Sequence, residues 1–365
     1  MFLMVEKISY VPPDFLHIYG ILIMESFPKK NAYMKTTIKD ISAKTGFGVG
    51  TISRALNSCP YSVKEETRKE ILQAAKKYNY IKDITAQILV TGKSFDIGLM
   101  IPAVFDSVFY NDFFIKLIAT VTSCSAQKGY SVRPIIMKKG MELNQFITEA
   151  RSLKLCGIII SSYCGDYFID EQAIKTFDNP IVILNAYMRG KNIYTINLDN
   201  FKGGHDGASF LISKGYKNIC VITAGKKDFW QRLKGYEKAM AGNGLKIKEE
   251  FIFHGDGSER SGYAVSMKVL NKAHRPDAIF ALNDQMAIGA IKAIKKSGLK
   301  CPSDVSVIGF DGLDIGGYTD PGLTTMLCPV DIIGREAVNI LLNPSARTTG
   351  RHCKIKATIL ERQSC

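Results

Sequence analysis

The spacing of apolar residues changes along the chain and divides it into a helical N-terminal part and a longer alternating part. From Thr37 to Tyr78, apolar residues recur every three or four positions in three short runs, which is typical of helices that pack together. From Ser94 onward, runs of consecutive apolar residues alternate with amphipathic stretches. This alternation predicts strands and helices in turn, the pattern of an α/β domain with doubly wound parallel sheets.

The helical part begins with two short helices joined by a glycine-containing turn. Thr36 or Thr37 can cap the first helix, and Gly46 can end it in a left-handed conformation. The apolar side of this helix, with Asp40 and Ser42 pointing outward, has three residues: Ile38, Ile41 and Ala43. The second helix opens at Gly48 or Val49, closes at Asn57, and has its own apolar side: Ile52, Ala55 and Leu56. Two helices joined in this way predict a helix-turn-helix.

A third helix is predicted in the basic stretch that follows. Ser62 as N-cap and Glu65 three residues later would form a capping box. The apolar positions of this helix are Ile71, Leu72, Ala75 and Tyr78.

The second helix of such a unit enters the major groove of DNA, so its outward residues are candidates for DNA contact. These residues are Val49, Gly50, Thr51, Ser53 and Arg54. Arg54 can bond to both acceptors of a guanine, and the hydroxyls of Thr51 and Ser53 suit phosphate oxygens. Two alternatives remain, because three-helix units also occur as packing modules and a lone arginine is by default a solvated charge.

The charge distribution favours a nucleic-acid partner. The chain has a net charge of +14 and a pI near 9.2. Residues 35 to 93 carry eleven Lys and Arg against five Asp and Glu, a local excess of 11 − 5 = +6. Such a concentration is the electrostatic footprint of phosphate contact, although a lysine-rich proteome would also raise the total charge.

The length, the cysteine pattern and the N-terminal segment favour a multidomain globular protein of a reducing compartment over a membrane or secreted protein. With 365 residues, 46% of them hydrophobic, the chain can form two or three domains that bury a core. The nine cysteines have no C-x-x-C spacing, which predicts a reducing cytoplasm and no metal site. Residues 1–33 contain an apolar run, Phe15 to Met24, that is too short for a membrane span and lacks the flanks of a signal peptide. We expect a poorly ordered extension there, with Met34 as an alternative start.

The long C-terminal part is predicted to form two sheets, because its strands are too numerous for one. The predicted strands are Ile97–Ile101, Ser131–Met137, Gly157–Ser161, Ile181–Asn185, Asn218–Thr223, Phe251–His254, Ala278–Leu282 and Val305–Phe310. Predicted helices between them include Phe113–Gln127 and Gly203–Lys214. Ligands of parallel sheets bind at the carboxyl ends of the strands.

Polar residues directly after these strands are therefore candidates for ligand binding. They are Asn185, Asn283, Asp284 and Asp311, joined by Arg232 at the expected start of a helix. Each of them alone could be a helix cap or loop residue, and Asp284 is most simply interpreted so. As a set they would form a cleft of carboxylates, amides and one guanidinium, which suits a ligand with many hydroxyl groups. Phe229 and Trp230 could stack on a sugar face, although a core position for Trp230 is an alternative.

The N-terminal motif T-I-K-D-I-S-A-K-T-G-F-G-V-G-T-I-S-R-A-L-N resembles the lactose/galactose-repressor (LacI/GalR-type) family, whose pattern is T-x-x-D-V-A-x-x-A-G-V-S-x-x-T-V-S-R-x-L-N. The similarity continues through S-V-K-E-E-T-R, A-L-N-D-Q-M-A-I-G-A, S-V-I-G-F-D and L-E-R-Q-S, and covers residues 36 to about 363. The resemblance implies that Val49, Gly50 and Arg54 read bases. Gly48 stands where the family usually has serine, and Lys82 where it usually has proline.

The resemblance also implies a hinge and an effector site. Asp83 would cap a hinge helix within residues 83–93, and Leu89 would wedge into the minor groove, although a linker residue packed on its own core is the alternative. The implied effector residues are Phe109, Tyr110, Asn185, Arg232, Asn283 and Asp311, with Asn185 where an aspartate often lies. The motif L-D-N-F-K-G-G would cap a helix through Asp199.

Together these features predict a cytoplasmic transcriptional regulator, a repressor that acts as a homodimer. Its expected partners are double-stranded operator DNA and a small effector, a sugar or related metabolite, with no cofactor and no membrane contact. The expected domains are the extension 1–33, the DNA-binding domain 34–82, the hinge 83–93 and the effector and dimerisation domain 94–365. The rival interpretation is a periplasmic-type sugar-binding receptor without a DNA role. An enzyme is disfavoured, because neither G-x-S-x-G nor G-x-G-x-x-G after a strand occurs.

Overall fold

The computed structural model describes residues 36–56, 63–81, 88, 94–102, 112–137, 142–161, 171–225, 227–272, 274–343 and 352–365. The chain divides into two compact units, Met1–Ala86 and Gln87–Cys365. The predicted extension 1–33 lies outside the described residues. Of the predicted hinge helix only Ile88 is described, and it is helical.

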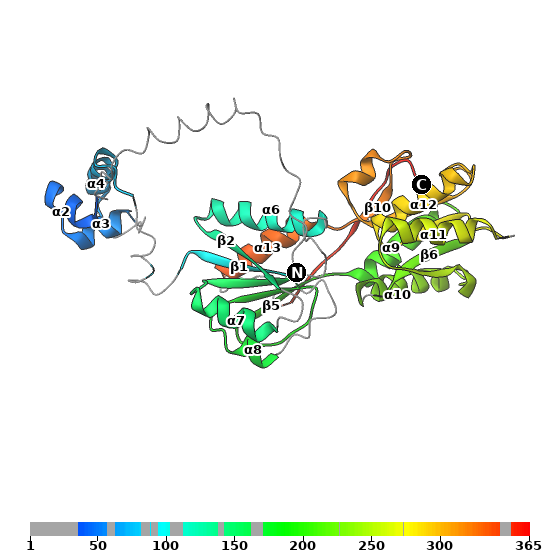
Figure 1. Cartoon of the computed structure of the whole chain (residues 1–365), viewed down its shortest axis with the longest axis horizontal. Helices are drawn as coiled ribbons and strands as arrows, with labels where there is room; N and C mark the ends of the chain where they lie inside the picture. The colour runs from blue at the N-terminus through cyan, green and yellow to red at the C-terminus, as the bar shows by residue number, and fades with distance from the viewer. Residues whose placement is uncertain are drawn as a thin grey trace, which may run out of the picture. The chain divides into compact units, whose positions relative to one another are not determined.

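The N-terminal unit contains three helices, α2 (Ile38–Thr45), α3 (Val49–Leu56) and α4 (Glu65–Lys77) (Figure 1). Thr37 caps α2, because its hydroxyl accepts the Asp40 amide at 3.3 Å while the Asp40 carboxylate accepts the Thr37 amide at 2.8 Å. Gly46 ends the helix at φ 75°, a left-handed conformation that glycine adopts without penalty. The predicted cap at Thr37 and stop at Gly46 are confirmed.

The small core of this unit is formed by Ile41, Ile52, Ala55 and Ile71. Two residues predicted to face it do not, since Ala43 is exposed and Leu72 is 47% exposed. Ala43 is two positions from Ile41, about 200° around the helix, and so lies on the opposite side. Leu72 is displaced by about 100° from the ridge that carries Ile71.

The predicted capping box before α4 is wrong. The helix begins at Glu65, with the extended Lys64 at the N-cap and no side-chain cap. Glu65 therefore lies in the first turn together with Glu66, where carboxylates interact favourably with the positive end of the helix dipole. The N-cap is therefore two residues later than predicted, and Ser62 itself lies outside the described residues.

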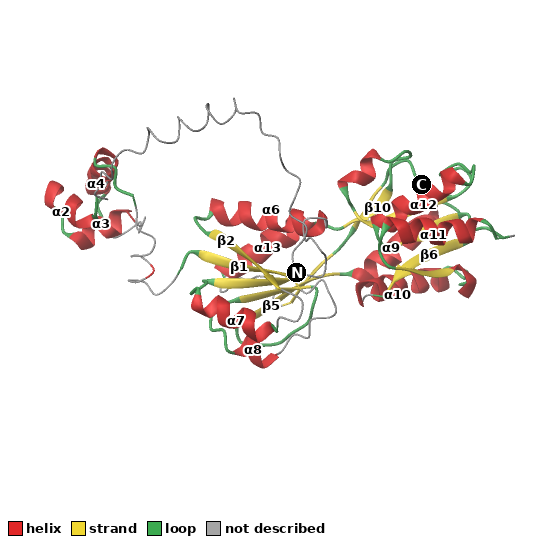
Figure 2. Cartoon of the chain, viewed as in Figure 1, coloured by secondary structure: helices red, strands yellow, loops and turns green. Residues whose placement is uncertain are grey.

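The C-terminal unit is built on two six-stranded sheets (Figure 2). The first sheet is parallel throughout, in the order β11 (His352–Ile355), β5 (Ile193–Leu198), β4 (Ile181–Leu184), β3 (Gly157–Ser161), β1 (Asp96–Pro102), β2 (Ser131–Met137). The second has the order β12 (Thr358–Leu360), β10 (Thr324–Leu327), β9 (Ser306–Asp311), β8 (Ala278–Ala281), β6 (Ile219–Ala224), β7 (Ile252–Gly255). Only β12 runs antiparallel to its neighbour among these paired strands.

Helices cover both sheets, as a doubly wound fold requires. On the first sheet α6 (Asp112–Gln127) and α13 (Val330–Leu342) lie on one side, and α7 (Leu143–Ser152) and α8 (Glu171–Lys175) on the other (Figure 1). On the second sheet α9 (Asn200–Ser213) packs against α10 (Lys227–Gly242), and α11 (Glu259–Leu270) against α12 (Asp284–Lys296). Two short 3₁₀ turns, η2 (Glu249–Phe251) and η3 (Asp314–Tyr318), complete the elements.

The chain passes between the two sheets three times. The first crossover is at Asp199, between β5 and α9. The second is at Cys328 and Pro329, between β10 of the second sheet and α13, which packs on the first. The third is at Lys356 and Ala357, between β11 and β12. Two subdomains joined by three connections can change their mutual angle only if all three connections adjust together.

The two-sheet prediction is confirmed, and each of the eight predicted strands is present with its ends displaced by at most one residue. Four further strands, β5, β10, β11 and β12, were not predicted. Helix α9 starts at Asn200, earlier than the predicted Gly203. Arg232 lies inside α10 rather than at its start, because that helix begins at Lys227.

Glycines let α9 and α10 approach to backbone contact. A Cβ at Gly235 would overlap the carbonyl oxygen of Phe201 and lie 2.6 Å from the amide nitrogen of His205. A Cβ at Gly204 would overlap the carbonyl of Arg232. The absence of both side chains therefore sets the helix spacing, and with it the distance from Arg232 to the start of α9.

We predict that Gly235→Ala lowers the free energy of unfolding by about 1–3 kcal/mol, because α9 and α10 must separate to admit the methyl group. Gly242→Ala is the matched control, since it lies at the end of the same helix and a Cβ there meets nothing within 4 Å. That control should be neutral or stabilising by up to about 1 kcal/mol. Urea denaturation followed by circular dichroism measures both variants, and equal losses would contradict the close-packing explanation.

Candidate functional site

Helix α3 presents a surface of small and polar residues with one cation. Val49 is 46% exposed, Gly50 and Arg54 are exposed, and Thr51 and Ser53 are half-buried. Arg54 Nη2 lies 3.5 Å from the Thr51 hydroxyl, so the guanidinium extends along the helix toward its N-terminus. A Cβ at Gly50 would lie 3.9 Å from Arg54 Nη1. Gly50 thus leaves open space beside the guanidinium.

The turn before α3 is held by its own residues. The Ser42 hydroxyl donates to the Phe47 carbonyl at 2.7 Å, and the Gly46 amide donates to the Ser42 carbonyl at 2.9 Å. The outward position predicted for Ser42 is therefore wrong, because its half-buried hydroxyl is needed to close the turn. The turn fixes the direction of α3 relative to α2.

A cavity of about 250 Å³ lies beside the first and third crossovers of the C-terminal unit. Its lining comes from the residues after β4, the segment joining β5 to α9, the first turns of α10, and β11. The polar side chains that line it are Asn185, Asn197, Asp199, Asn200, Asp228, Gln231 and Lys354, and two aromatic residues, Tyr187 and Phe201, complete it. Tyr187 is 61% exposed and Phe201 41% exposed. Amides, carboxylates and exposed rings together match the needs of a polyhydroxylated ligand.

Arg232 lies next to this cavity and joins several elements. The side chain is 3% exposed, and its Nε donates to the Asn200 side-chain oxygen at 2.8 Å. Its Nη1 donates to the Leu282 carbonyl at 2.6 Å and lies 3.2 Å from Asp311 Oδ1. The guanidinium also stacks on a ring of the core, with Cζ 3.6 Å from the centroid of Phe310. Protein groups alone therefore fix the position of the Arg232 side chain.

Asp311 ends β9 in an unusual backbone conformation. Its φ is 127°, a region that side-chain-bearing residues rarely adopt. Burial raises the pKa of its carboxyl group to about 7, although the neighbouring Arg232 guanidinium lowers it and nearby Asp284 raises it further. A carboxyl group with this pKa can donate or accept a hydrogen bond at neutral pH.

Asn283 and Asp284 follow β8 and serve structural functions in this conformation. The Asn283 side-chain oxygen accepts the Met286 amide at 3.0 Å and so caps α12, while its Nδ2 donates to the Gly257 carbonyl at 2.8 Å. Asp284 is fully buried, and burial raises the pKa of its carboxyl group. The expectation that Asp284 is a cap or loop residue is wrong, since the cap is Asn283 and Asp284 lies inside the fold.

Comparison with known proteins assigns both units. The model for bacterial regulatory proteins of the lacI family matches residues 37–83, and the model for a periplasmic binding protein-like domain matches residues 208–365. The HTH-type transcriptional regulator MalR of Clostridium butyricum is 32% identical over 343 residues, covering 90% of this chain and 98% of MalR. The chain belongs to the lacI family of bacterial regulatory proteins. This regulator therefore binds DNA and is not an enzyme.

Further relatives agree with this assignment. The probable HTH-type transcriptional repressor ExuR of Bacillus subtilis is 32% identical to this LacI-family chain over 314 residues, covering 84% of the chain and 91% of ExuR. The lac repressor dimer bound to operator and the anti-inducer ONPF has a TM-score of 0.71 at 24% identity, covering 90% of this chain and 99% of that one. The CelR–cellobiose complex has a TM-score of 0.66 at 22% identity, covering 91% and 100%. These two structures support the fold.

The structure of this LacI-family regulator brings some predicted effector residues together and separates others. Arg232 and Asp311 are in direct contact, and Asn283 directly follows Leu282, whose carbonyl accepts from Arg232. Asn185 lines the cavity at φ 58°, a left-handed conformation that asparagine tolerates, and its side-chain oxygen accepts the Leu198 amide at 3.1 Å.

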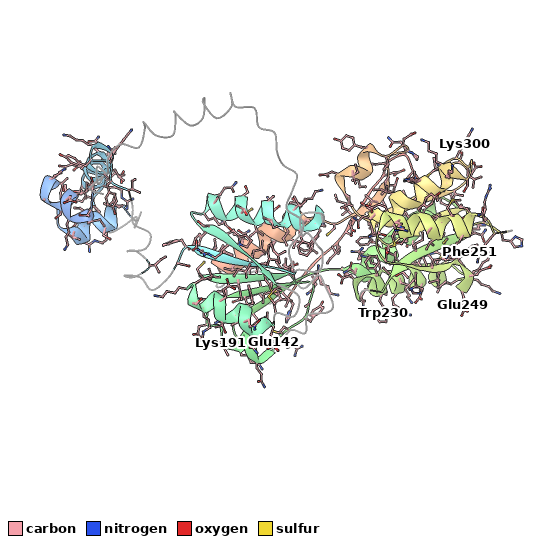
Figure 3. All side chains as sticks on the ribbon, viewed as in Figure 1. Glu142, Lys191, Trp230, Glu249, Phe251 and Lys300 are labelled. Carbon is pink, nitrogen blue, oxygen red and sulfur yellow. The ribbon has the colours of Figure 1, made fainter. Side chains whose placement is uncertain are left out.

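Both aromatic candidates on α10 lie away from the cavity lining. Trp230 is 53% exposed on the outer side of the helix (Figure 3), so a core position for it is wrong. Phe229 is buried in the core, 5.4 Å from Arg232 Cζ. The residues Leu89, Phe109 and Tyr110 lie outside the described residues.

Sequence reasoning missed several residues of the LacI-family cleft. Asp199 was predicted to cap α9 and does so, accepting the Lys202 amide at 3.1 Å, but it also lines the cavity. Asn200 was not considered, although the next position in the same L-D-N motif pointed to it. Asp228, Gln231 and Lys354 carry no comparable local signal. Within the described parts of the chain, no helix combines the length and apolar character needed to cross a bilayer.

The raised pKa of Asp311 predicts a specific dependence of stability on pH. Since its folded-state pKa of about 7 exceeds the ordinary 3.8, the folded chain holds a proton between these values that the unfolded chain releases. The free energy of unfolding of the wild type should therefore fall, relative to Asp311→Asn, by up to about 1 kcal/mol per pH unit as pH rises toward 7. Above that pH the difference should level off.

Urea denaturation of both proteins at pH 5, 6, 7 and 8 checks this prediction. All other titrating groups are shared, so their contributions largely cancel in the difference. A difference that stays flat from pH 5 to 8 would mean that Arg232 holds the carboxyl group ionised, because neither state would then gain or lose a proton in this range.

Proposed function

We propose that this regulator is a cytoplasmic repressor that acts as a homodimer and whose operator affinity is controlled by a small effector, a sugar or related metabolite. The single observation that carries the proposal is the cavity lined by amides, carboxylates and two rings beside the crossovers of a two-sheet domain, in a chain that also has a DNA-binding head. The relatives named as repressors and the cellobiose complex of CelR support it.

The chemistry of the cavity favours a neutral, polyhydroxylated effector. Each sugar hydroxyl both donates and accepts, so it matches side chains that mix amides with carboxylates. Asn185, Asn197 and Gln231 supply amides, and Asp199 and Asp228 supply carboxylates. Tyr187 and Phe201 offer rings on which the apolar face of a sugar can stack.

The position of the cavity supports a role in switching. Asp199 is both a lining residue and the first crossover, and Lys354 on the lining precedes the third. The second crossover is bonded to the site as well, because the Cys328 amide donates to the Asp311 carbonyl at 3.1 Å. A ligand here can favour one subdomain angle over another, which is the differential affinity a switch requires.

An exposed apolar surface supports association with a second copy. Ile315 is 53% exposed and Tyr318 86% exposed on η3, while Ile115 is 42% exposed on α6. An ion pair of 2.9 Å between Lys116 and Asp314 brings these two elements side by side. Large apolar side chains gathered in this way favour a protein partner over water.

We predict that a sugar stabilises the wild type and that Asp311→Ala abolishes this response. The probes are maltose, cellobiose, ribose and galacturonate in a thermal-shift screen, with adenosine as a nucleoside and hypoxanthine as a sugar-free base for comparison. A ligand present at 100 times its Kd stabilises by about 2.7 kcal/mol, and the variant should show none of this gain. Asp311→Ala should still bind DNA.

The matched control for this screen is Asp304→Ala, at the opposite end of β9, where the exposed side chain accepts only the Lys300 amide among the bonds described. It should respond to the ligand like the wild type. A hit that stabilises Asp311→Ala equally would refute the assignment of the site.

We predict that operator recognition depends on Arg54 and on two heads. DNA selected from a random library by the wild type should contain an inverted repeat, since a symmetric dimer reads two half-sites. Arg54→Ala should weaken binding to this DNA by about 1–3 kcal/mol and bind random DNA almost as before. Fluorescence anisotropy at fixed salt measures both.

Lys69→Ala is the charge-matched control, because Lys69 is exposed on α4 rather than on the reading helix. This variant should bind the selected DNA and random DNA more weakly than the wild type, by the same small factor. Equal losses for Arg54→Ala on both DNAs would mean that Arg54 contacts phosphate only, and a selected site with a single half-site would contradict a dimer.

A further inference from the structure

Asp284 is a fully buried carboxylate that bridges three elements outside the cavity lining. It belongs to the first turn of α12, and its Oδ1 accepts the hydroxyl of Thr325 in β10 at 2.5 Å. Its Oδ2 accepts the amide of Leu313, in the turn after β9, at 2.6 Å. A buried carboxylate is costly unless it is hydrogen-bonded, so these contacts are needed for the fold.

The turn that Asp284 holds begins at Asp311. Asp311 has a φ of 127° and Gly312 a φ of 79°, so two consecutive residues are on the left-handed side of the backbone map. A non-glycine residue persists in that region only when its surroundings determine its conformation. The Leu313 amide, two residues on, is fixed by Asp284, and the Asp311 carboxylate is fixed by Arg232.

The same turn is bonded to the second crossover. The carbonyl of Asp311 accepts the amide of Cys328, the first residue after β10. Pro329 follows as the N-cap of α13, which packs on the other sheet. Asp311 therefore has its side chain against Arg232, beside the cavity, and its main chain on a connection between the subdomains.

We propose that Asp284 is a positioning residue that holds the Asp311–Leu313 turn in its strained form and thereby ties the ligand-binding carboxylate to the second crossover. This inference rests on the proposed function, because it gives Asp284 its part in an effector-controlled switch. Asp284 forms two hydrogen bonds close to the second crossover. In one it accepts the Leu313 amide of the turn, and in the other it accepts the hydroxyl of Thr325, two residues before the end of β10. A change in the conformation of Asp311 is transmitted to Cys328 only while Asp284 fixes both the turn at Leu313 and strand β10 at Thr325.

The Asp284 carboxylate occupies the space that a side chain at position 309 would need. A Cβ at Gly309 would overlap Asp284 Oδ1, and its next neighbours would be Leu323 and Ala287 at 3.1 and 3.2 Å. Gly309→Ala should therefore displace Asp284 without changing any polar group. It is a second variant that tests the same position by a different physical route.

Hydrogen exchange of the ligand-free protein followed by mass spectrometry tests the proposal. Asp284→Asn keeps the size of the side chain but removes the charge that both donors share. Peptides covering residues 311–315 and 326–330 should exchange at least tenfold faster than in the wild type, while peptides of β6 and β7 stay unchanged. Gly309→Ala should give the same local pattern.

The control is Asp304→Asn, which alters another carboxylate that accepts a backbone amide, that of Lys300 at 2.7 Å, at the far end of β9. It should leave residues 326–330 protected. Unchanged exchange at 326–330 in both Asp284→Asn and Gly309→Ala would overturn the proposal. Faster exchange throughout the unit would also overturn it, since Asp284 would then support only overall stability.

A ligand titration separates this inference from the proposed function. With the sugar that stabilises the wild type, Asp284→Asn should bind at least tenfold more weakly and should show no ligand-induced protection at 326–330. Full retention of that protection would overturn the inference while leaving the proposed function intact. If no sugar binds the wild type, the effector assignment fails, and the exchange measurements on the ligand-free protein still decide the role of Asp284.

Discussion

The burial of one arginine constrains the C-terminal unit more than any other single contact. A buried guanidinium is tolerated only if its charge is paired and its N–H groups are hydrogen-bonded. Arg232 meets this requirement with Asn200 at the start of α9, the carbonyl of Leu282 after β8, and Asp311 at the end of β9. The ends of three elements must therefore meet at one point. That point is the carboxyl edge of the second sheet, where ligands of such folds bind.

The helix layers bring these groups within bonding distance through backbone contact rather than side-chain packing. Gly204 and Gly235 allow α9 and α10 to touch, and Gly262 and Gly289 do the same for α11 and α12. The first pair sets the distance from Arg232 to Asn200. The second pair seats the helix whose first turn carries Asp284. Both polar networks of the site thus depend on positions where no side chain is tolerated.

The sequence could predict eight strands and the polar residues that follow several of them, but not β5 and β10, which place Thr and Asn at buried positions and so lack a continuous apolar run. It did not reveal β11 and β12, because edge strands such as H-C-K-I mix polar and apolar residues and bury little. The topology of parallel sheets was enough to select Asn185, Asn283 and Asp311 as candidates, whereas Arg232 was chosen from an expected helix start that lies at Lys227 instead. It could not identify Asn200 or the role of Asp284, since these depend on which elements pack together. Trp230 was ambiguous because an aromatic residue in a helix does not reveal its direction, and Leu89, Phe109 and Tyr110 stay predictions.

A switch needs two states of similar free energy, and the geometry at Asp311 provides a reason for such a balance. Its backbone is strained, and burial raises the pKa of its carboxyl group to about 7. Burial limits the hydrogen bonds that the Asp311 carboxyl group can form with water, and the hydroxyl groups of a ligand would supply hydrogen bonds in their place. A ligand would therefore favour the turn conformation in which the carboxyl group can form these bonds. The carbonyl of Asp311 accepts the amide of Cys328, so a change in the turn conformation also moves a connection between the subdomains. The strain at Asp311 is therefore better explained by switching than by ligand affinity alone, for which a relaxed turn would suffice.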